Sequence, residues 1–126
     1  MKKDLPRIAD SEWRVMQVLW KFGSQTANDV VEALSGETDW SPRTVKTLIS
    51  RLVKKGAVKV TDEGYRYQYT AAVEESECIR SETKSFVRRV YQGTKTPALA
   101  AFLEDTDLTE KEIDELQEIL DKKKGG

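Results

Sequence analysis

The stretch SPRTVKTLISRLVKK, residues 41–55, decides the predicted fold, because it indicates one helix with two unlike faces. Ser41 suits the N-cap, where its hydroxyl can accept a free backbone N–H, and Pro42 suits the first helical position, where no N–H is needed. Four apolar residues recur at the i, i+3, i+4, i+7 spacing of a helical stripe: Val45, Leu48, Ile49 and Leu52. This stripe is expected to pack on a core.

The opposite face of this helix has only hydrogen-bond donors and small hydroxyls, with no acidic residue. At roughly 100° per residue, it comprises Arg43, Thr47, Ser50, Arg51 and Lys54. A helix that buries one face and presents such side chains on the other is suited to the major groove of DNA. An ordinary amphipathic surface helix is the alternative, although such helices usually mix Glu with Lys.

Two shorter helices are predicted before this one. Asp10 or Ser11 can cap the first, which runs to about Lys21. Thr26 can cap the second, over residues 27–35, where apolar residues again recur at helical spacing. The sequence therefore predicts three helices in the first half of the chain.

A β-hairpin is predicted after Gly56, which ends the third helix. Residues 58–61 alternate as a strand does, residues 62–64 (Asp-Glu-Gly) are typical of a hairpin turn, and residues 65–69 alternate tyrosine with polar side chains. Most of these tyrosines are interpreted as strand and core packing.

Three helices followed by a two-stranded hairpin are the winged form of the helix-turn-helix motif. The third helix then enters the major groove, and the hairpin, or wing, lies along the phosphates or in a neighbouring groove. Arg66 and Lys59 could neutralise phosphates from this hairpin.

Three further amphipathic helices are predicted in the second half, over residues 74–91 and 97–104 and after the capping box Thr109-Glu110-Lys111-Glu112. They are too small a set to close a dry core alone, so a second copy of the chain is expected to contribute the same helices. Folding back on the first domain is the alternative. The residues expected in the dimer interface are Phe86, Val90, Phe102, Ile113, Leu116 and Leu120.

The predicted fold class is mostly α with a small β-hairpin. It comprises an N-terminal winged helix-turn-helix, residues 1–72, and a C-terminal three-helix dimerisation domain, residues 73–126. A two-fold dimer would present two copies of the 41–55 helix to a pseudo-palindromic DNA site.

The net charge of −1 hides an asymmetry along the chain. Residues 1–70 hold 12 Lys and Arg against 9 Asp and Glu, whereas residues 71–126 hold 9 against 13. A polyanion would therefore meet a basic surface only in the first half. The near-neutral total argues against indiscriminate binding through the whole surface.

Several chemistries find no support in the sequence. It has no histidine, no Gly-rich phosphate loop and one cysteine, Cys78, so an enzyme is disfavoured, and no metal or cofactor is expected. No run of 18 apolar residues is present, so no membrane insertion is expected. The N-terminal MKKDLPRIAD is not typical of a secretory signal, which favours a cytoplasmic protein.

The segments SEWRVMQVLW, TANDVVEAL, WSPRTVKTLISRLVKKGAV and GYRYQYT resemble the BlaI/MecI family of penicillinase and methicillin-resistance repressors, which also takes in copper-responsive repressors. The likeness extends through SFVRRVYQGT and LTEKEIDELQEILDKKK. It implies a cytoplasmic homodimeric transcriptional repressor with a winged helix and a helical dimerisation domain. By this resemblance, the positions matching DNA contacts are Thr44, Lys46, Thr47 and Arg51, with Arg66 on the wing.

Two departures limit what the resemblance implies. Copper-responsive relatives have paired C-terminal cysteines, whereas this chain ends in KKKGG, so copper sensing is disfavoured. The penicillinase type is switched off by proteolysis at an Asn-Phe bond, after signalling by a membrane β-lactam sensor. The matching pair here is Ala101-Phe102, without the Asn. Ala101 and Phe102 thus form a candidate cleavage site for a signalling protease, or Phe102 is simply dimer core.

The resulting hypothesis is repression by occlusion, in which a dimer on a double-stranded operator blocks polymerase. The DNA-binding residues are predicted to be Ser41, Arg43, Thr44, Lys46, Thr47, Ser50, Arg51, Lys54 and Arg66. Two alternatives stay open: a winged helix used for protein–protein assembly, and a regulator gated by a small molecule.

Overall fold

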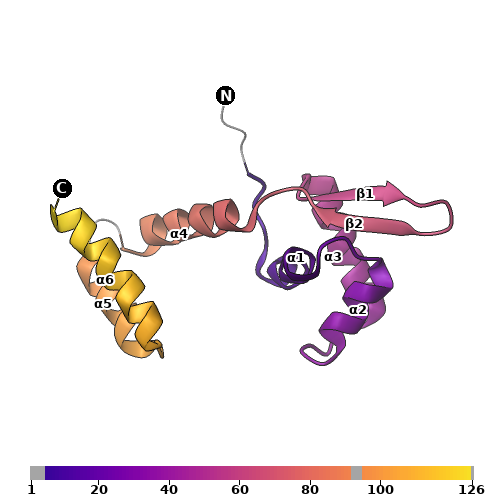
Figure 1. The fold of residues 1–126 in the computed structure, drawn as a ribbon. Helices are drawn as coiled ribbons and strands as arrows, with labels where there is room; N and C mark the ends of the chain where they lie inside the picture. The colour runs from indigo at the N-terminus through magenta and orange to yellow at the C-terminus, as the bar shows by residue number, and fades with distance from the viewer. Residues whose placement is uncertain (1–4, 92–94, 126) are drawn as a thin grey trace. The chain divides into compact units, whose positions relative to one another are not determined.

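The computed structural model describes residues 5–91 and 95–125, and it confirms a mostly helical chain with one two-stranded hairpin (Figure 1). The chain divides into two units, Met1–Thr83 and Lys84–Gly126, each of which is described by itself. The elements follow in the order α1 (Asp10–Phe22), α2 (Ala27–Ser35), α3 (Pro42–Lys55), β1 (Val58–Asp62), β2 (Tyr67–Ala71), α4 (Glu75–Tyr91), α5 (Lys95–Asp105) and α6 (Glu110–Gly125).

The core of the first unit lies between α1, α2, α3 and the base of the hairpin. The predicted stripe of α3 is confirmed, since Val45, Leu48, Ile49 and Leu52 are all at most 4% exposed. Val15, Met16 and Leu19 of α1 and Val30 and Leu34 of α2 meet this stripe in the same cluster. Apolar burial on three helix faces thus fixes which side of α3 remains outside.

The caps of α2 and α3 are the predicted ones. Thr26 Oγ1 accepts the Asp29 N–H at 3.1 Å, and the Asp29 carboxylate accepts the Thr26 N–H at 3.1 Å. Ser41 Oγ accepts the Thr44 N–H at 3.2 Å, and Gly56 closes α3 with φ of 84°. These groups satisfy backbone atoms that a helix end leaves free.

The predicted cap of α1 is wrong. Asp10 is already helical and Ala9 is the N-cap residue, with no side chain able to cap. Instead, Glu12 Oε1 accepts the Ala9 N–H at 2.8 Å. The helix therefore begins at Asp10 itself. The Glu12 carboxylate, within the first turn, takes the capping role that was predicted for the side chain of Asp10 or Ser11.

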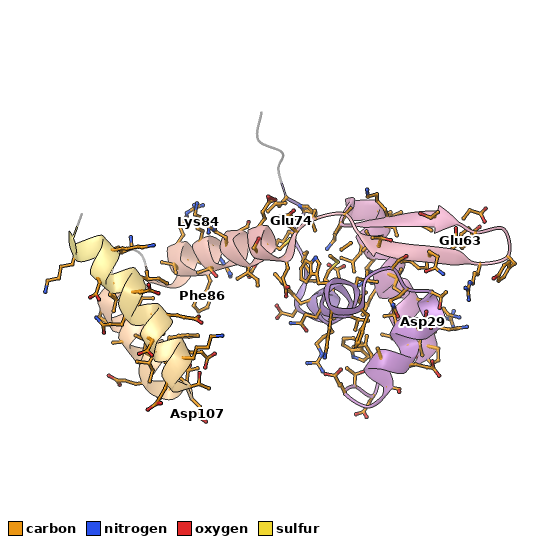
Figure 2. All side chains as sticks on the ribbon, viewed as in Figure 1. Asp29, Glu63, Glu74, Lys84, Phe86 and Asp107 are labelled. Carbon is orange, nitrogen blue, oxygen red and sulfur yellow. The ribbon has the colours of Figure 1, made fainter. Side chains whose placement is uncertain are left out.

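The wing differs from the prediction at its second strand, which begins at Tyr67 rather than residue 65. The Glu63 N–H donates to the Arg66 carbonyl at 2.8 Å and the Gly64 N–H donates to Asp62 Oδ1 at 2.8 Å. These bonds close the turn around Tyr65, so this residue cannot join the ladder. Figure 2 labels Glu63 in this part of the hairpin.

The hairpin pairs antiparallel, with Val60 opposite Tyr69, and is extended by a bridge from the α1–α2 connection. Gln25 and Tyr69 exchange backbone hydrogen bonds of 2.9 and 2.7 Å. Tyr69 packs against the core as interpreted, but Tyr65 is 84% and Tyr67 54% exposed. The outer tyrosines therefore do not serve core packing, because the wing extends beyond the helices.

The division between the units falls inside α4, whereas the boundary after residue 72 stays a prediction based on element type. Cys78, near the start of α4, is buried in the first unit's core, which ties the first turns of the helix to the winged helix. In the second unit, the predicted capping box opens α6: Thr109 and Glu112 exchange bonds of 2.9 and 3.1 Å.

Candidate nucleic-acid interface

The outward face of α3 is a continuous set of donors. Burial of the apolar stripe turns the cations and hydroxyls of this face to solvent: Arg43, Thr47, Ser50, Arg51 and Lys54 are all exposed, and so is the predicted DNA-binding residue Lys46 beside them. No Asp or Glu lies within α3. This face can therefore meet phosphates and base acceptors without like-charge repulsion.

A shallow groove of about 410 Å³ lies on this face, lined by Arg43, Lys46, Thr47 and Ser50. Lys46, which lies outside the set predicted for the outward face, thus shares the groove with three residues of that face. Thr47 Oγ1 donates to the Arg43 carbonyl at 3.0 Å, so its oxygen remains able to accept a bond from a base. Two cations and two hydroxyls in one groove can engage both phosphate oxygens and base edges.

The first turn of α3 has exposed hydroxyls with a structural role. Ser41 Oγ and Thr44 Oγ1 lie 3.1 Å apart, and Ser41 also caps the helix. The free N–H groups of a helix N-terminus favour anions, and a phosphate could approach these hydroxyls. Their predicted DNA contacts stay predictions.

The last turn of α3 is held to the start of α1. Lys55 Nζ donates to the Arg7 carbonyl at 2.9 Å and to the carboxylate of Glu12, which is 1% exposed. Burial alone would raise the pKa of Glu12. The hydrogen bonds from Lys55 and from the Ala9 N–H, with the charges of Lys55 and Arg51, outweigh burial and lower this pKa. Lys55 is therefore engaged within the protein.

The wing places Arg66 in its turn, beside exposed carboxylates. The Arg66 guanidinium lies 5.3 Å from the centre of the Tyr65 ring, a cation–π distance, and both side chains are exposed. Hydrogen bonds from Thr26 lower the pKa of Asp29, with a smaller contribution from the Arg66 charge. Arg66 therefore lies within electrostatic range of the start of α2.

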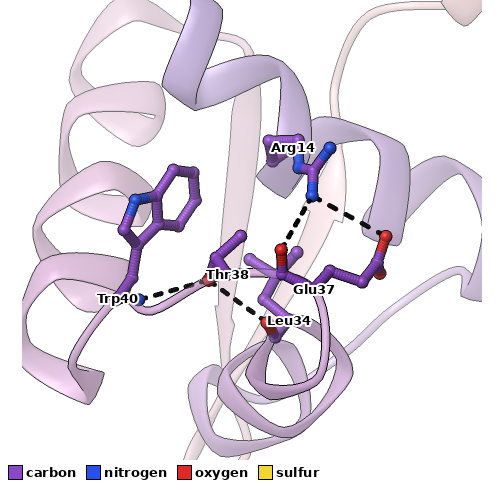
Figure 3. A network of polar contacts seen from close by, with 5 residues as sticks. All are labelled: Arg14, Leu34, Glu37, Thr38 and Trp40. Atoms are coloured by element: carbon purple, nitrogen blue, oxygen red, sulfur yellow. Dashed lines mark hydrogen bonds and ion pairs between the residues drawn. The ribbon is translucent and has the colours of Figure 1, made fainter.

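The connection between α2 and α3 contains a polar network that sequence patterns did not indicate (Figure 3). Arg14 Nη2 of α1 lies 3.4 Å from the Glu37 carbonyl and 3.8 Å from Glu37 Oε1. Thr38 Oγ1 donates to the Leu34 carbonyl at 3.2 Å and accepts the Trp40 N–H at 3.3 Å. No local motif signals the contact between Arg14 and Glu37, because these residues meet only through folding.

The predicted dimerisation residues of the second unit are largely at its surface. Phe86, Phe102, Ile113 and Leu120 are 46%, 63%, 50% and 56% exposed, Leu116 is half-buried, and the Val90 side chain lies outside the described part. The candidate cleavage pair, Ala101 and Phe102, is exposed within α5. Figure 2 labels Phe86 on α4. Large apolar side chains on a surface mark a contact site when they are contiguous.

The described part of the chain offers neither a cluster of metal ligands nor a membrane-spanning helix. Among residues 5–91 and 95–125, no three His, Cys, Asp or Glu side chains gather as metal ligands would. The helices of the same residues are too short or too polar to cross a bilayer. Burial raises the pKa of the Cys78 thiol.

Three helices, a wing and a donor-only face on the third helix define a winged-helix DNA-binding protein. The family model described as penicillinase repressor matches residues 8–122, and the chain belongs to this family. Since the family consists of DNA-binding regulators, the chain is not an enzyme.

Curated relatives and solved structures agree with this assignment. A penicillinase repressor of Bacillus licheniformis is 41% identical over 122 residues, covering 97% of this chain and 95% of that protein. The methicillin resistance regulatory protein MecI of Mammaliicoccus sciuri is 39% identical over 116 residues, covering 92% and 94%. The monomeric form of Bacillus licheniformis BlaI, solved with the blaP half-operator, is 42% identical over 60% of this chain and 93% of that one, with a TM-score of 0.53.

Proposed function

We propose that this chain is a transcriptional repressor that binds an operator as a homodimer, through α3 and the wing. The observation that carries the proposal is the donor-only face of α3 in a member of the penicillinase repressor family. The relative solved with a half-operator supports the same use of this unit. A repressor of chromosomal genes would act in the cytoplasm, where that DNA is.

The exposed side chains of α3 and of the wing have two roles in this proposal, contact with phosphates and contact with base edges. Arg43, Lys54 and the wing's Arg66 neutralise phosphates, which supplies most of the affinity and makes it sensitive to salt. Thr47 and Arg51 contact base edges, Arg51 by a bidentate bond to guanine, and Lys46 reaches a base edge or a phosphate. Ser41, Thr44 and Ser50 bond to the backbone of the DNA. Occupation of an operator that overlaps a promoter then excludes polymerase.

Dimerisation is assigned to the second unit. Its exposed apolar side chains on α5 and α6 are Leu99, Phe102, Leu103, Ile113, Ile119 and Leu120. Placing them against a second copy would remove them from water and pair two α3 helices for a pseudo-palindromic site. The half-operator bound by the monomeric form of the relative fits a site of two halves.

We further propose that a signalling protease relieves repression by cleaving the chain between Ala101 and Phe102. This proposal depends on the first one. Both residues are exposed, but they lie in the middle of α5, so a protease would have to unwind a helical turn. Cleavage there would detach α6 from the rest of the chain and weaken the dimer. Coexpression with a β-lactam sensor protease and mass measurement of the fragments would test it. An intact chain after induction would contradict it.

The deciding experiment is selection of bound fragments from genomic DNA by the purified chain at about 150 mM salt. An enriched inverted repeat upstream of a few genes is the expected result. Binding without sequence preference that vanishes as salt rises would instead favour protein–protein assembly. An operator affinity that changes on adding a small molecule would favour a ligand-gated regulator.

A further inference from the structure

The segment between α2 and α3, residues 36–41, determines where α3 begins. It is longer than the turn of roughly 3–4 residues in an ordinary helix-turn-helix, so its direction depends on bonds within it. Hydrogen bonds to base edges are directional and weaken steeply when misaligned. A small tilt of α3 would therefore affect base contacts strongly.

One hydroxyl spans this segment. Thr38 Oγ1 donates to the Leu34 carbonyl in the last turn of α2 and accepts the N–H of Trp40, the residue before the α3 cap. The same Leu34 carbonyl accepts the N–H groups of Glu37 and Thr38, at 3.1 and 2.9 Å. Hydrogen bonds of the Thr38 hydroxyl thus connect the last turn of α2 with the residue just before the α3 cap (Figure 3).

Both ends of this bridge are attached to the core. Leu34 is 2% exposed, and the Trp40 side chain packs against the core cluster. Arg14 adds a tie from α1 to Glu37, but its side chain is 41% and that of Glu37 62% exposed, so this tie is weak. The half-buried Thr38 hydroxyl is consequently a firmer side-chain link than the bond of Arg14.

We infer that Thr38 is a positioning residue for sequence-specific DNA recognition: it sets the start of α3, and hence the aim of Arg43 and Thr47, without contacting DNA itself. The inference rests on the proposed function. It predicts that loss of the hydroxyl affects specific binding more than non-specific binding. Phosphate contacts tolerate a small tilt of α3, whereas bonds to base edges do not.

The test compares Thr38→Val, which keeps the shape and removes the hydroxyl, with Thr38→Ser, which keeps the hydroxyl. The probes are the duplex that the wild-type chain selects from a random-sequence library and a scrambled duplex of equal length. Fluorescence anisotropy gives both affinities over a series of salt concentrations. Thr83→Val is the matched control, because Thr83 Oγ1 also donates to a carbonyl, that of Ile79, but in α4.

Thr38→Val should bind the selected duplex about tenfold more weakly, with scrambled-duplex affinity and salt slope within about twofold of wild type. Thr38→Ser should restore most of the loss, and Thr83→Val should show none. Arg14→Gln, which weakens only the partly exposed tie to Glu37, should lower the ratio of selected-duplex to scrambled-duplex affinity by at most about twofold.

Unchanged binding of the selected duplex by a folded Thr38→Val would overturn the inference. So would an equal fall in both affinities, since that pattern marks a general loss of folded protein. If Thr38→Val fails to fold, Thr38→Ala, which removes the same hydroxyl, replaces it, and an unchanged ratio of selected-duplex to scrambled-duplex affinity would overturn the inference. If the wild-type chain selects no motif at all, the proposed function itself fails, which is a distinct result.

Discussion

Lys55, the last residue of α3, donates from its ammonium group to the carboxylate of Glu12 in the first turn of α1. Glu12 is the one charged residue buried in the core region of the described chain, and the Ala9 N–H also donates to it. The end of α3 is therefore held by an ion pair whose carboxylate is buried and whose ammonium group is partly exposed. Because the Lys55 ammonium group bonds within the protein, we expect the pair to contribute to folding stability and not to contact DNA.

Replacing Glu12 by Gln should destabilise the first unit by about 1–2 kcal/mol, because Lys55 loses its charged partner while the shape is kept. Urea unfolding followed by tryptophan fluorescence measures the change. Glu32→Gln, an exposed position of α2, should stay within about 0.5 kcal/mol of wild type. Equal stability of the Glu12 and Glu32 variants would contradict this role.

The same pair predicts a dependence on pH. Folding lowers the pKa of Glu12, so its contribution is present above the ordinary pKa and is lost as the pH falls through the folded value. The stability difference between wild type and Glu12→Gln should thus be constant near neutral pH and shrink below about pH 4.3. Unfolding curves between about pH 7 and about pH 3 check this. A difference that grew in acid would show the opposite shift.

Arg51→Ala should weaken operator binding by about 1–3 kcal/mol and relax preference at one base pair, if Arg51 makes a bidentate base contact. Lys54→Ala should instead weaken binding to all sequences alike and reduce the salt slope by about one. Arg80→Ala, on an exposed position of α4, is the control and should leave both measurements unchanged. An unchanged operator affinity in Arg51→Ala would make the assignment wrong.

Leu120→Glu should convert the dimer to monomer, because a carboxylate would be placed in an apolar contact without a partner. Leu120 is 56% exposed on α6, so the substitution should leave the fold of the single chain intact. Sedimentation velocity should show at least a tenfold weaker self-association, with Glu118→Gln on the same helix as the unaffected control. A wild-type chain that sediments as a monomer would refute the dimer.

Gly56→Ala should cost about 1 kcal/mol of stability, because Gly56 ends α3 with φ of 84°, where a Cβ is strained. Gly36 provides the matched comparison, since it ends α2 with φ of −86° and has open space around it. Gly36→Ala should be neutral or slightly stabilising. Thermal unfolding of the two variants distinguishes them, and an equal loss in both would exclude the backbone explanation.

Local sequence signals were sufficient for α3 and for its exposed face. Ser41, Pro42 and Gly56 act within one turn of the helix ends, and the apolar stripe has the helical period whatever it packs against. The Thr26 cap of α2 and the capping box of α6 were predictable for the same reason. The donor-only face followed directly, since burial of one stripe leaves the opposite side chains outside.

Specific hydrogen bonds, which capping preferences and periodicity do not report, explain where prediction and structure differ. Ala9 caps α1 because Glu12 bonds to it while also meeting Lys55, which is far away in sequence. The strand predicted from residue 65 starts later because the bonds of the turn include Arg66. Periodicity within a strand contains no information about how its turn closes.

The sequence by itself determined the order of the elements, the winged-helix class and the side chains that face outward from α3. Only the tertiary structure decided which distant residues hold α3 and the segment before it: Lys55 bonds to Arg7 and Glu12 at the end of α3, and Arg14 bonds to Glu37 ahead of its start. The physical reason is range. Capping and helical periodicity act over about four residues, whereas the bonds of Arg14 and Lys55 join residues that only the packed core brings together.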